Sequence, residues 1–410
     1  MTALFLAALF ASLGVRLWLS FRQERHVRAH RAAVPDAFAE SIPLAAHQKA
    51  ADYTVRRLRL GRVAAPARAA LLLAFTLGGG LQALADVWDQ GTLLAGAAFV
   101  LSALFLAELC LLPFAIYSTF VIEERFGFNR TTPALFASDL LKQALLTVLL
   151  GGPLVYGALW LISSGGPFWW LLLWAAWVGV SLFFTWAYPV LIAPLFFKFT
   201  PLDDDALLQR IRDLLQRTGF SSEGIFVMDG SRRSSHANAY FTGLGRRKRI
   251  VLFDTLCQTM AAAEVESVLA HELGHFKLHH LRWRLGAGAA LGLAGIAVFR
   301  LVIEHAWFYE GLGVADVSAH AGLLLFLWIA PLFTFPLRPL LSAWSRRHEY
   351  AADAFAATHS DGQALVSALV KMYEHNAATL TPDPIHSAFH DSHPPAPLRV
   401  ARLRGARTPF

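Results

Sequence analysis

Two apolar stretches joined by a short turn decide the fold: QALLTVLLGGPLVYGALWLIS at 143–163 and PFWWLLLWAAWVGVSLFFTWAYPVLIAPLF at 167–196. Neither stretch contains an acidic or a basic residue. A helix needs about 20 predominantly apolar residues to cross a bilayer, and both stretches are long enough. Serine, glycine and proline between them favour a tight turn. The pattern therefore predicts two antiparallel membrane helices.

Further apolar stretches of the same character lie on both sides of this pair, at about 2–20, 67–86, 93–117, 284–303 and 321–343. The first lacks a basic start and a small-residue cleavage site, so we expect it to be a retained helix rather than a signal peptide. Two polar regions remain, at about 197–283 and 344–410. The sequence predicts an all-α membrane protein with seven transmembrane helices, divided into an N-terminal membrane module (1–196) and a second module (197–410).

The composition excludes several classes of protein. Hydrophobic residues make up 56% of the 410 residues and charged residues only 16%, against about 45–50% and 25% in soluble proteins. Intrinsic disorder and a single water-soluble core are both excluded. The net charge is +7, but the cations form blocks beside apolar stretches and no nucleic-acid motif is present. We therefore expect a lipid bilayer, and not nucleic acid, as the partner of these cations.

The distribution of charge also predicts an orientation. The connections 87–92, 164–166 and 304–320 contain no lysine or arginine, whereas the segments after the first, third and fifth stretches are basic. The positive-inside rule then places the N-terminus outside and both polar regions in the cytoplasm. Two charges fall within spans: we expect Glu108 to face the protein interior or a cavity, and Arg300 to extend toward the membrane surface.

The chemistry centres on VLAHELGHF at 268–276, within a stretch of helical character that begins at about Ala261. The motif H-E-x-x-H places His271 and His275 on one helical face, where both imidazoles can reach one ion. Glu272 lies beside them and can take a proton from metal-bound water. Imidazole and carboxylate ligands suit Zn²⁺, so we predict one zinc ion per chain.

A third ligand is predicted in SRRHEYAADAFA at 345–356. Glu349 would complete a His₂Glu set, as in thermolysin-like (gluzincin) enzymes. Asp353 lies on the same helical face, where it could fix the tautomer of a ligating histidine or donate a proton during turnover. His348 is a rival ligand, but it points about 100° away from Glu349 on a helix.

Short strands are predicted between these elements, in GIFVM at 224–228, NAYFTG at 238–243 and RIVLFD at 249–254, with Gly230, Gly243 and Gly245 at turns. Together with the H-E-x-x-H helix they predict a small α+β zinc-protease domain. An exposed strand edge beside a metal can bind an extended peptide through backbone hydrogen bonds. Asn238 and Ala239 are therefore candidate substrate-binding residues, although an ordinary hairpin would show the same pattern.

Several of these segments, taken together, resemble the type I integral-membrane CAAX prenyl endopeptidases, a family of zinc metalloproteases. The matching segments are SSHANAYF at 234–241, DTL at 254–256, HELGHFKLHH at 271–280, SRRHEYAADAFA at 345–356, and TFVIEERFGFN at 119–129. His393-Pro394, followed by Arg399 and Leu403, resembles the C-terminal signature of that family. The resemblance extends over nearly the whole chain.

The resemblance implies a barrel of seven membrane helices around a hydrated chamber that the zinc site faces. It implies that His271, His275 and Glu349 hold zinc, that Glu272 activates water and that Asp353 assists. It further places His393 near the site, where it could stabilise the tetrahedral intermediate or merely form a His-Pro turn. Arg399 is expected to bind substrate or pair with site carboxylates. Eukaryotic members are expected to have an aromatic residue at the position of His348. This difference and the short tail fit a bacterial-type member, so we expect a bacterial inner membrane.

The predicted function is a membrane zinc metalloendopeptidase acting on peptide or protein substrates that are membrane-bound, lipidated or of the CAAX type. A broad quality-control protease of membrane proteins is one alternative. A non-catalytic transporter or scaffold with structural zinc is another, although a closed structural site would not need Glu272.

Overall fold

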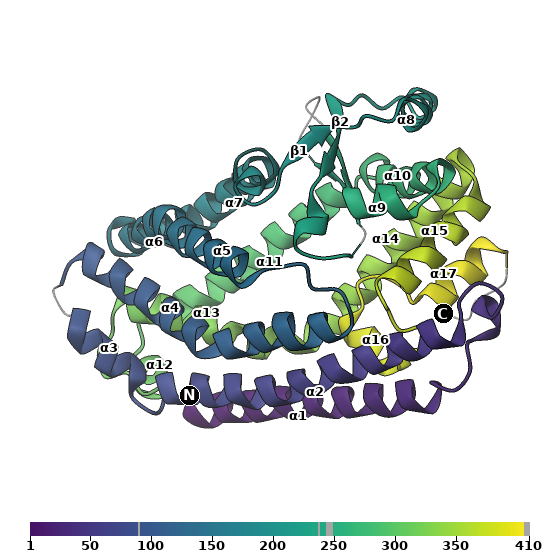
Figure 1. The fold of residues 1–410 in the computed structure, drawn as a ribbon. Helices are drawn as coiled ribbons and strands as arrows, with labels where there is room; N and C mark the ends of the chain where they lie inside the picture. The colour runs from purple at the N-terminus through teal and green to yellow at the C-terminus, as the bar shows by residue number, and fades with distance from the viewer. Residues whose placement is uncertain (89–90, 237, 243–248, 406–410) are drawn as a thin grey trace.

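The computed structural model describes residues 1–410 apart from 89–90, 237, 243–248 and 406–410, so the predicted turns at Gly243 and Gly245 lie outside the described residues. Long helices dominate the N-terminal half (Figure 1). They are α1 (Thr2–Ala29), α2 (Leu44–Phe75), α3 (Gly80–Trp88), α4 (Leu93–Tyr117), α5 (Pro133–Leu146), α6 (Gly152–Ser164) and α7 (Trp169–Ala187). Short π-helical turns extend α4, join α5 to α6 and extend α7.

The C-terminal half adds four short strands and the remaining helices. The strands are β1 (Phe199–Pro201), β2 (Gly224–Met228), β3 (Ala239–Thr242) and β4 (Arg249–Phe253). The helices are α8 (Asp205–Arg217), α9 (Asp254–Thr259), α10 (Ala262–Lys277), α11 (His280–Ile303), α12 (Ala306–Glu310), α13 (Ala319–Thr334), α14 (Arg338–His359), α15 (Gly362–His375), α16 (Pro384–His390) and α17 (Ala396–Leu403).

The described residues include six helical segments long and apolar enough to cross a membrane, and a seventh if α2 and α3 together form one span. The predicted stretch 67–86 falls on that pair, but it is not one straight helix: α2 and α3 meet at 51°. The break contains Gly79, whose φ of +77° suits glycine, and Thr76, whose hydroxyl donates to the Leu72 carbonyl. The last span is longer than predicted, because α13 and α14 form one segment over Ala319–His359. That continuity carries a membrane helix directly into the polar C-terminal region.

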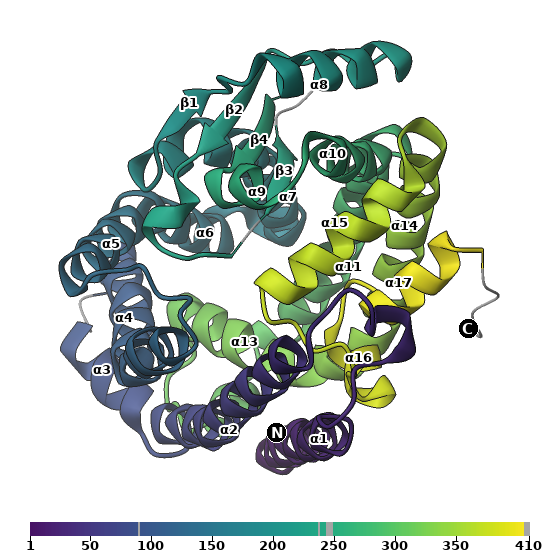
Figure 2. The same ribbon diagram turned by 45° about the vertical axis from the view of Figure 1, so that its right-hand side comes forward.

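The spans form a ring of helices rather than a close-packed bundle, as Figure 2 shows. One cavity of about 1190 Å³ is bounded by residues of α1, α2, α4, α13 and α16. Glu108 of α4 lines this cavity, as expected for a charge within a span. Arg300 lies over the ring of Trp170, 5.7 Å from its centroid. The fold is therefore an all-α membrane barrel that carries a small α+β domain.

The small domain is built on a four-stranded sheet of order β1-β2-β4-β3. The predicted strands at 224–228, 238–243 and 249–254 are confirmed as β2, β3 and β4; β1 was not predicted. β2 and β4 pair in parallel, and β3 lies antiparallel to β4 at the sheet edge. Helices α8 and α10 share one buried core with this sheet, centred on fully buried side chains such as Ile211, Ile250 and Leu269. The sheet and this core fix the position of α10.

Helix α10 is also fixed at its first turn. The Glu264 carboxylate accepts a hydrogen bond from the Ala261 backbone N–H at 2.8 Å, which satisfies one of the free donors at a helix start. The same carboxylate accepts hydrogen bonds from Ser367 at 2.6 Å and Lys371 at 2.7 Å, both on α15. Further along, Glu266 pairs with Arg217 of α8 at 2.6 Å. These contacts hold α10 firmly between α8 and α15.

Candidate active site

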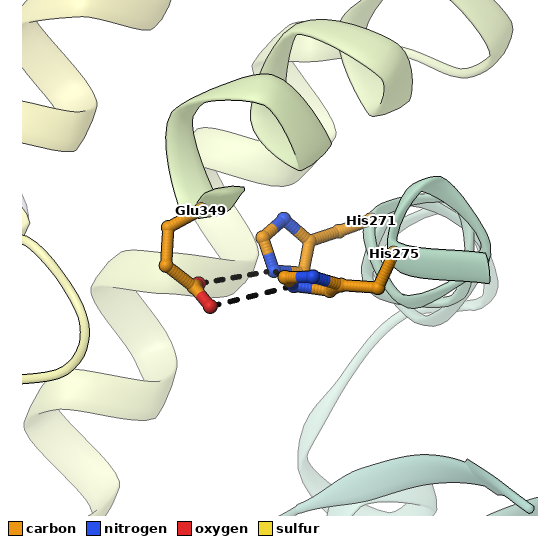
Figure 3. A group of neighbouring side chains, drawn as sticks. All are labelled: His271, His275 and Glu349. Carbon is orange, nitrogen blue, oxygen red and sulfur yellow. Dashed lines mark hydrogen bonds and ion pairs between the residues drawn. The ribbon is translucent and has the colours of Figure 1, made fainter. Parts of the chain in front are cut away.

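Three predicted ligands, His271 and His275 of α10 and Glu349 of α14, converge on one point (Figure 3). The Nε2 atoms of His271 and His275 lie 3.3 Å apart. Each Nε2 lies 3.4 Å from a different oxygen of Glu349. His271 and Glu349 are buried, with 6% and 4% exposed surface. The structure thus brings together two helices that are separated in sequence by α11, α12 and α13.

Gly274 allows α14 to approach this closely. A Cβ atom at Gly274 would lie 3.1 Å from the Cα of Ala352 and 3.1 Å from the Cβ of Phe355, closer than ordinary van der Waals contact. The glycine of H-E-L-G-H is therefore a point of close approach between α10 and α14. Any side chain there would move the Glu349 carboxylate away from the two imidazoles.

The three residues fit a zinc ion. Ligand atoms about 2.0–2.1 Å from a tetrahedral Zn²⁺ lie roughly 3.3–3.4 Å from one another, which is the spacing observed here. In addition, the buried Oε2 of Glu349 has no hydrogen-bond partner among the described residues. A buried carboxylate oxygen without a partner is unfavourable unless a cation binds it. His348 lies outside this group, with its ring stacked on that of His280.

Asp353 and Arg399 lie directly behind His271. The Asp353 Oδ1 is 2.8 Å from the His271 Nδ1, so Nδ1–H donates to it when Nε2 faces the metal. Arg399 of α17 binds the same carboxylate through two hydrogen bonds, at 2.6 and 2.9 Å, and is itself 6% exposed. This ion pair keeps Asp353 ionised as a hydrogen-bond acceptor, which favours the orienting role over proton donation. Substrate binding by Arg399 stays a prediction.

His275 is oriented differently, by another histidine. Its Nδ1 lies 2.9 Å from the Nδ1 of His280, at the start of α11. The sharp turn between the helices is made by His279, in the left-handed conformation with φ of +60°. His280 stacks on His348, with ring centroids 4.1 Å apart and planes within 10°. Because a metal on Nε2 of His275 leaves a proton on Nδ1, His280 must accept that proton's hydrogen bond and carry its own on Nε2.

Replacing His280 with alanine should weaken zinc binding about 10- to 100-fold, since His275 loses the acceptor that fixes its ring. Asparagine at 280, whose side-chain carbonyl can accept the same hydrogen bond, should recover part of the loss. The affinity is measured by chelator competition on purified protein. His279→Asn is the matched control, because His279 is exposed and asparagine tolerates its left-handed backbone. Unchanged affinity in His280→Ala would contradict this role.

The predicted base and the predicted oxyanion donor both lie at the cluster. Glu272 follows His271 on α10, and burial raises its pKa, although the nearby His271 and His275 oppose this shift. A carboxylate with a raised pKa is a better general base near neutral pH. The Nε2 of His393 lies 3.4 Å from the Oε1 of Glu349, and its side chain is 62% exposed. His393 therefore stands beside the metal ligands on an accessible side.

Zinc binding should release a proton and tighten as the pH rises. In the metal-free protein, burial lowers the pKa of His271, but the neighbouring carboxylates of Asp353 and Glu349 outweigh it and raise the pKa to about 9. Below that pH a proton competes with zinc for His271, so the apparent affinity should improve by up to about tenfold per pH unit until pH 9. Chelator competition at several pH values measures this slope. A flat profile between pH 6 and 9 would contradict it.

The candidate substrate-binding residues lie at the sheet edge. Ala239 begins the edge strand β3 and is buried, paired with Leu252 of β4. Asn238 is exposed; its backbone carbonyl accepts from Phe253, and its side-chain oxygen from the backbone N–H of Ala239. These contacts fix the start of β3. Binding of a peptide along this edge stays a prediction.

Two residues at the site were given no role from the sequence. Gly274 and His280 both stand in the quoted segment HELGHFKLHH, but their roles depend on contacts with α14 and with His275. His280 contacts His275 and is not one of the predicted metal ligands, so no ligand-spacing motif in the sequence identifies it.

Comparisons with known proteins agree with this architecture. Residues 23–198 match the model of the CAAX prenyl protease N-terminal domain with five membrane helices, and residues 201–407 match peptidase family M48. The chain is 39% identical over 318 residues to CAAX prenyl protease 1 homolog of Oryza sativa, covering 77% of this chain and 75% of the relative. It is 31% identical to the Caenorhabditis elegans homolog, covering 98% of both chains.

A solved structure agrees over nearly the whole length. The crystal structure of S. mikatae Ste24p superposes with a TM-score of 0.91 at 29% identity, covering 98% of both chains. These relatives are eukaryotic, so the bacterial source remains a prediction. The chain belongs to the CAAX prenyl protease family and is a multi-pass membrane metalloendopeptidase of peptidase family M48.

Proposed function

We propose that this protein is a zinc endopeptidase that cleaves CAAX-type C-terminal peptides on the carboxyl side of the cysteine, in substrates held at the membrane. The observation that carries the proposal is the His271, His275 and Glu349 cluster with Glu272 beside it, in a ring of membrane helices. The basic loops favour an orientation in which the N-terminus lies outside and the site faces the cytoplasm. The membrane in this proposal is the bacterial cell membrane. Residues 1–196 form the membrane module and 197–410 the metallopeptidase module.

The roles of the residues follow from their positions. His271, His275 and Glu349 would hold the zinc ion, whose Lewis acidity would polarise the scissile carbonyl and lower the pKa of water. Glu272 takes the proton of the attacking water and passes it to the leaving amine. Asp353, held by Arg399, keeps the proton of His271 on Nδ1.

The remaining predicted residues act on the substrate. His393, exposed beside Glu349, donates a hydrogen bond to the oxyanion as it develops. The substrate backbone adds to the edge of the sheet near Asn238 and Ala239, as an extra extended strand. An edge strand is suited to this because one side of β3 pairs with no other strand among the described residues.

The test uses purified protein in lipid nanodiscs with a farnesylated CAAX peptide and, separately, an unfolded soluble protein. Mass spectrometry of the products should show one cut after the cysteine, which chelation abolishes and zinc restores. Cleavage at many internal sites of both substrates would favour the quality-control alternative. Zinc binding without cleavage of either substrate would favour a scaffold with structural zinc.

A further inference from the structure

One face of α14 holds the C-terminal segment of the chain against the active site. Arg346, Glu349 and Asp353 follow one another at intervals of three and four residues, so they share that face. Glu349 is a predicted zinc ligand, and its Oε1 lies 3.4 Å from the Nε2 of His393. Asp353 binds Arg399, which lies further along the same C-terminal segment. Arg346 precedes both carboxylates on this face.

The Arg346 side chain binds the end of α16, immediately before His393. Its Nη1 donates hydrogen bonds to the backbone carbonyls of Asp391, at 3.0 Å, and of Ser387, at 3.4 Å. The Ser387 carbonyl also accepts a hydrogen bond from the Asp391 backbone N–H at 2.9 Å. The last carbonyls of a helix have no partner within the helix, and an arginine that binds them is also favoured by the helix dipole. Arg346 thus holds the C-terminal end of α16 against α14.

The opposite end of α16 is fixed independently. The Asp383 carboxylate caps the helix by accepting from the backbone N–H groups of Ile385 and His386, at 3.1 and 2.9 Å. The same carboxylate accepts two hydrogen bonds from Arg22 of α1, at 2.8 and 3.2 Å. Because α1 holds the start of α16, the contacts with α14 determine where the helix ends. The Arg346 hydrogen bond of 3.0 Å is the shortest that the described α14 side chains make to this helix end.

The position of His393 depends on the backbone that precedes it. His393 stands in a segment without regular secondary structure between α16 and α17, and its side chain is 62% exposed. Its Nδ1 lies 3.0 Å from the Oγ of Ser392. When this hydroxyl donates to Nδ1, the imidazole proton lies on Nε2, the atom that faces Glu349. Since Ser392 alone separates His393 from Asp391, a shift at the Arg346 contact passes directly to this donor.

We propose that Arg346 is a positioning residue for His393. It holds the backbone before His393 against α14, so that the imidazole stays beside Glu349 and its Nε2–H can reach the developing oxyanion. The inference rests on the proposed function, because it takes His393 to stabilise the tetrahedral intermediate. A misplacement of about 1 Å can cost as much as 10²-fold in rate although every catalytic group is present. The effect of Arg346 on the reaction therefore passes through the backbone.

The first measurement is hydrogen–deuterium exchange of the zinc-loaded protein in detergent, which needs no turnover. Arg346→Met should speed exchange over residues 387–395 severalfold, because the end of α16 opens more readily, and should leave exchange in α10 unchanged. Arg347→Met is the matched control, because Arg347 is exposed at the next position of the same helix; it should leave exchange over 387–395 unchanged. Unchanged exchange over this segment in Arg346→Met would overturn the inference.

The second measurement is a double-mutant cycle on the turnover of a farnesylated CAAX peptide. Arg346→Met should lower kcat about 10- to 100-fold, with KM and zinc affinity unchanged. Arg346→Lys should recover part of this loss, because an ammonium group can donate to the same carbonyls. In a His393→Ala background, Arg346→Met should cause little further loss, because the group that it positions is absent.

Two results of this cycle would overturn the inference. One is an equal loss of kcat from Arg346→Met in the parent and the His393→Ala backgrounds. The other is weaker zinc binding in both the methionine and the lysine variants, since Arg346 would then support the ligand Glu349 rather than His393. A parent protein that cleaves no CAAX peptide would contradict the proposed function instead, and the exchange measurement would still decide whether Arg346 anchors the segment.

Discussion

Replacing Glu272 with glutamine should abolish peptide hydrolysis while leaving the zinc content unchanged. Glu272 is not one of the three residues whose ligand atoms converge, so the metal keeps its protein ligands. Glutamine has nearly the same shape but cannot accept a proton, and general acid–base catalysis typically contributes about 10²–10⁴-fold to the rate. The turnover of a CAAX peptide should fall by at least that factor. Zinc is measured in parallel by atomic absorption on the same purified sample.

Glu374→Gln provides the control, because Glu374 is an exposed carboxylate on α15, away from the ligands; it should retain full activity. Full turnover by Glu272→Gln with zinc bound would exclude Glu272 as the base. Loss of zinc together with activity would instead make Glu272 part of the metal site, against the arrangement described here.

The local features of the site could be predicted because they depend on spacing within one helix. His271 and His275 are four residues apart, and so are Glu349 and Asp353, so each pair shares a face wherever its helix lies. The strands at 224–228, 239–242 and 249–253 also followed from a local alternating pattern. Length and hydrophobicity alone indicated the spans, because the bilayer sets how long a helix must be.

Features that depend on packing between distant elements could not be predicted in this way. The bend between α2 and α3 falls within residues 69–81, which carry no charge, so hydropathy alone did not mark it. Glu349 was placed near the histidines by its motif, but the contact that permits this, Gly274 against Ala352, is a property of two helices together. The cavity between α1, α2, α4, α13 and α16 likewise has no linear signal.

Replacing Arg399 with methionine should destabilise the protein by about 3–5 kcal/mol, because it leaves the buried carboxylate of Asp353 without its cation. Both side chains are almost fully buried, and two hydrogen bonds join them. Without Arg399, His271 is the one partner of opposite charge that Asp353 keeps among the described residues. The free energy of unfolding is followed by thermal denaturation of the metal-free protein in detergent, so that the metal does not contribute to the difference.

The double variant Asp353→Leu/Arg399→Met separates stability from metal binding. Replacing a buried ion pair with apolar residues of similar volume is often neutral for stability, so most of the lost stability should return. Zinc affinity should not return: His271 still lacks the acceptor that fixes its tautomer, and a loss of about 10- to 100-fold is expected. If the double variant bound zinc as tightly as the parent protein, Asp353 would serve stability alone, and the orientation of His271 would have to come from Glu349 and the metal.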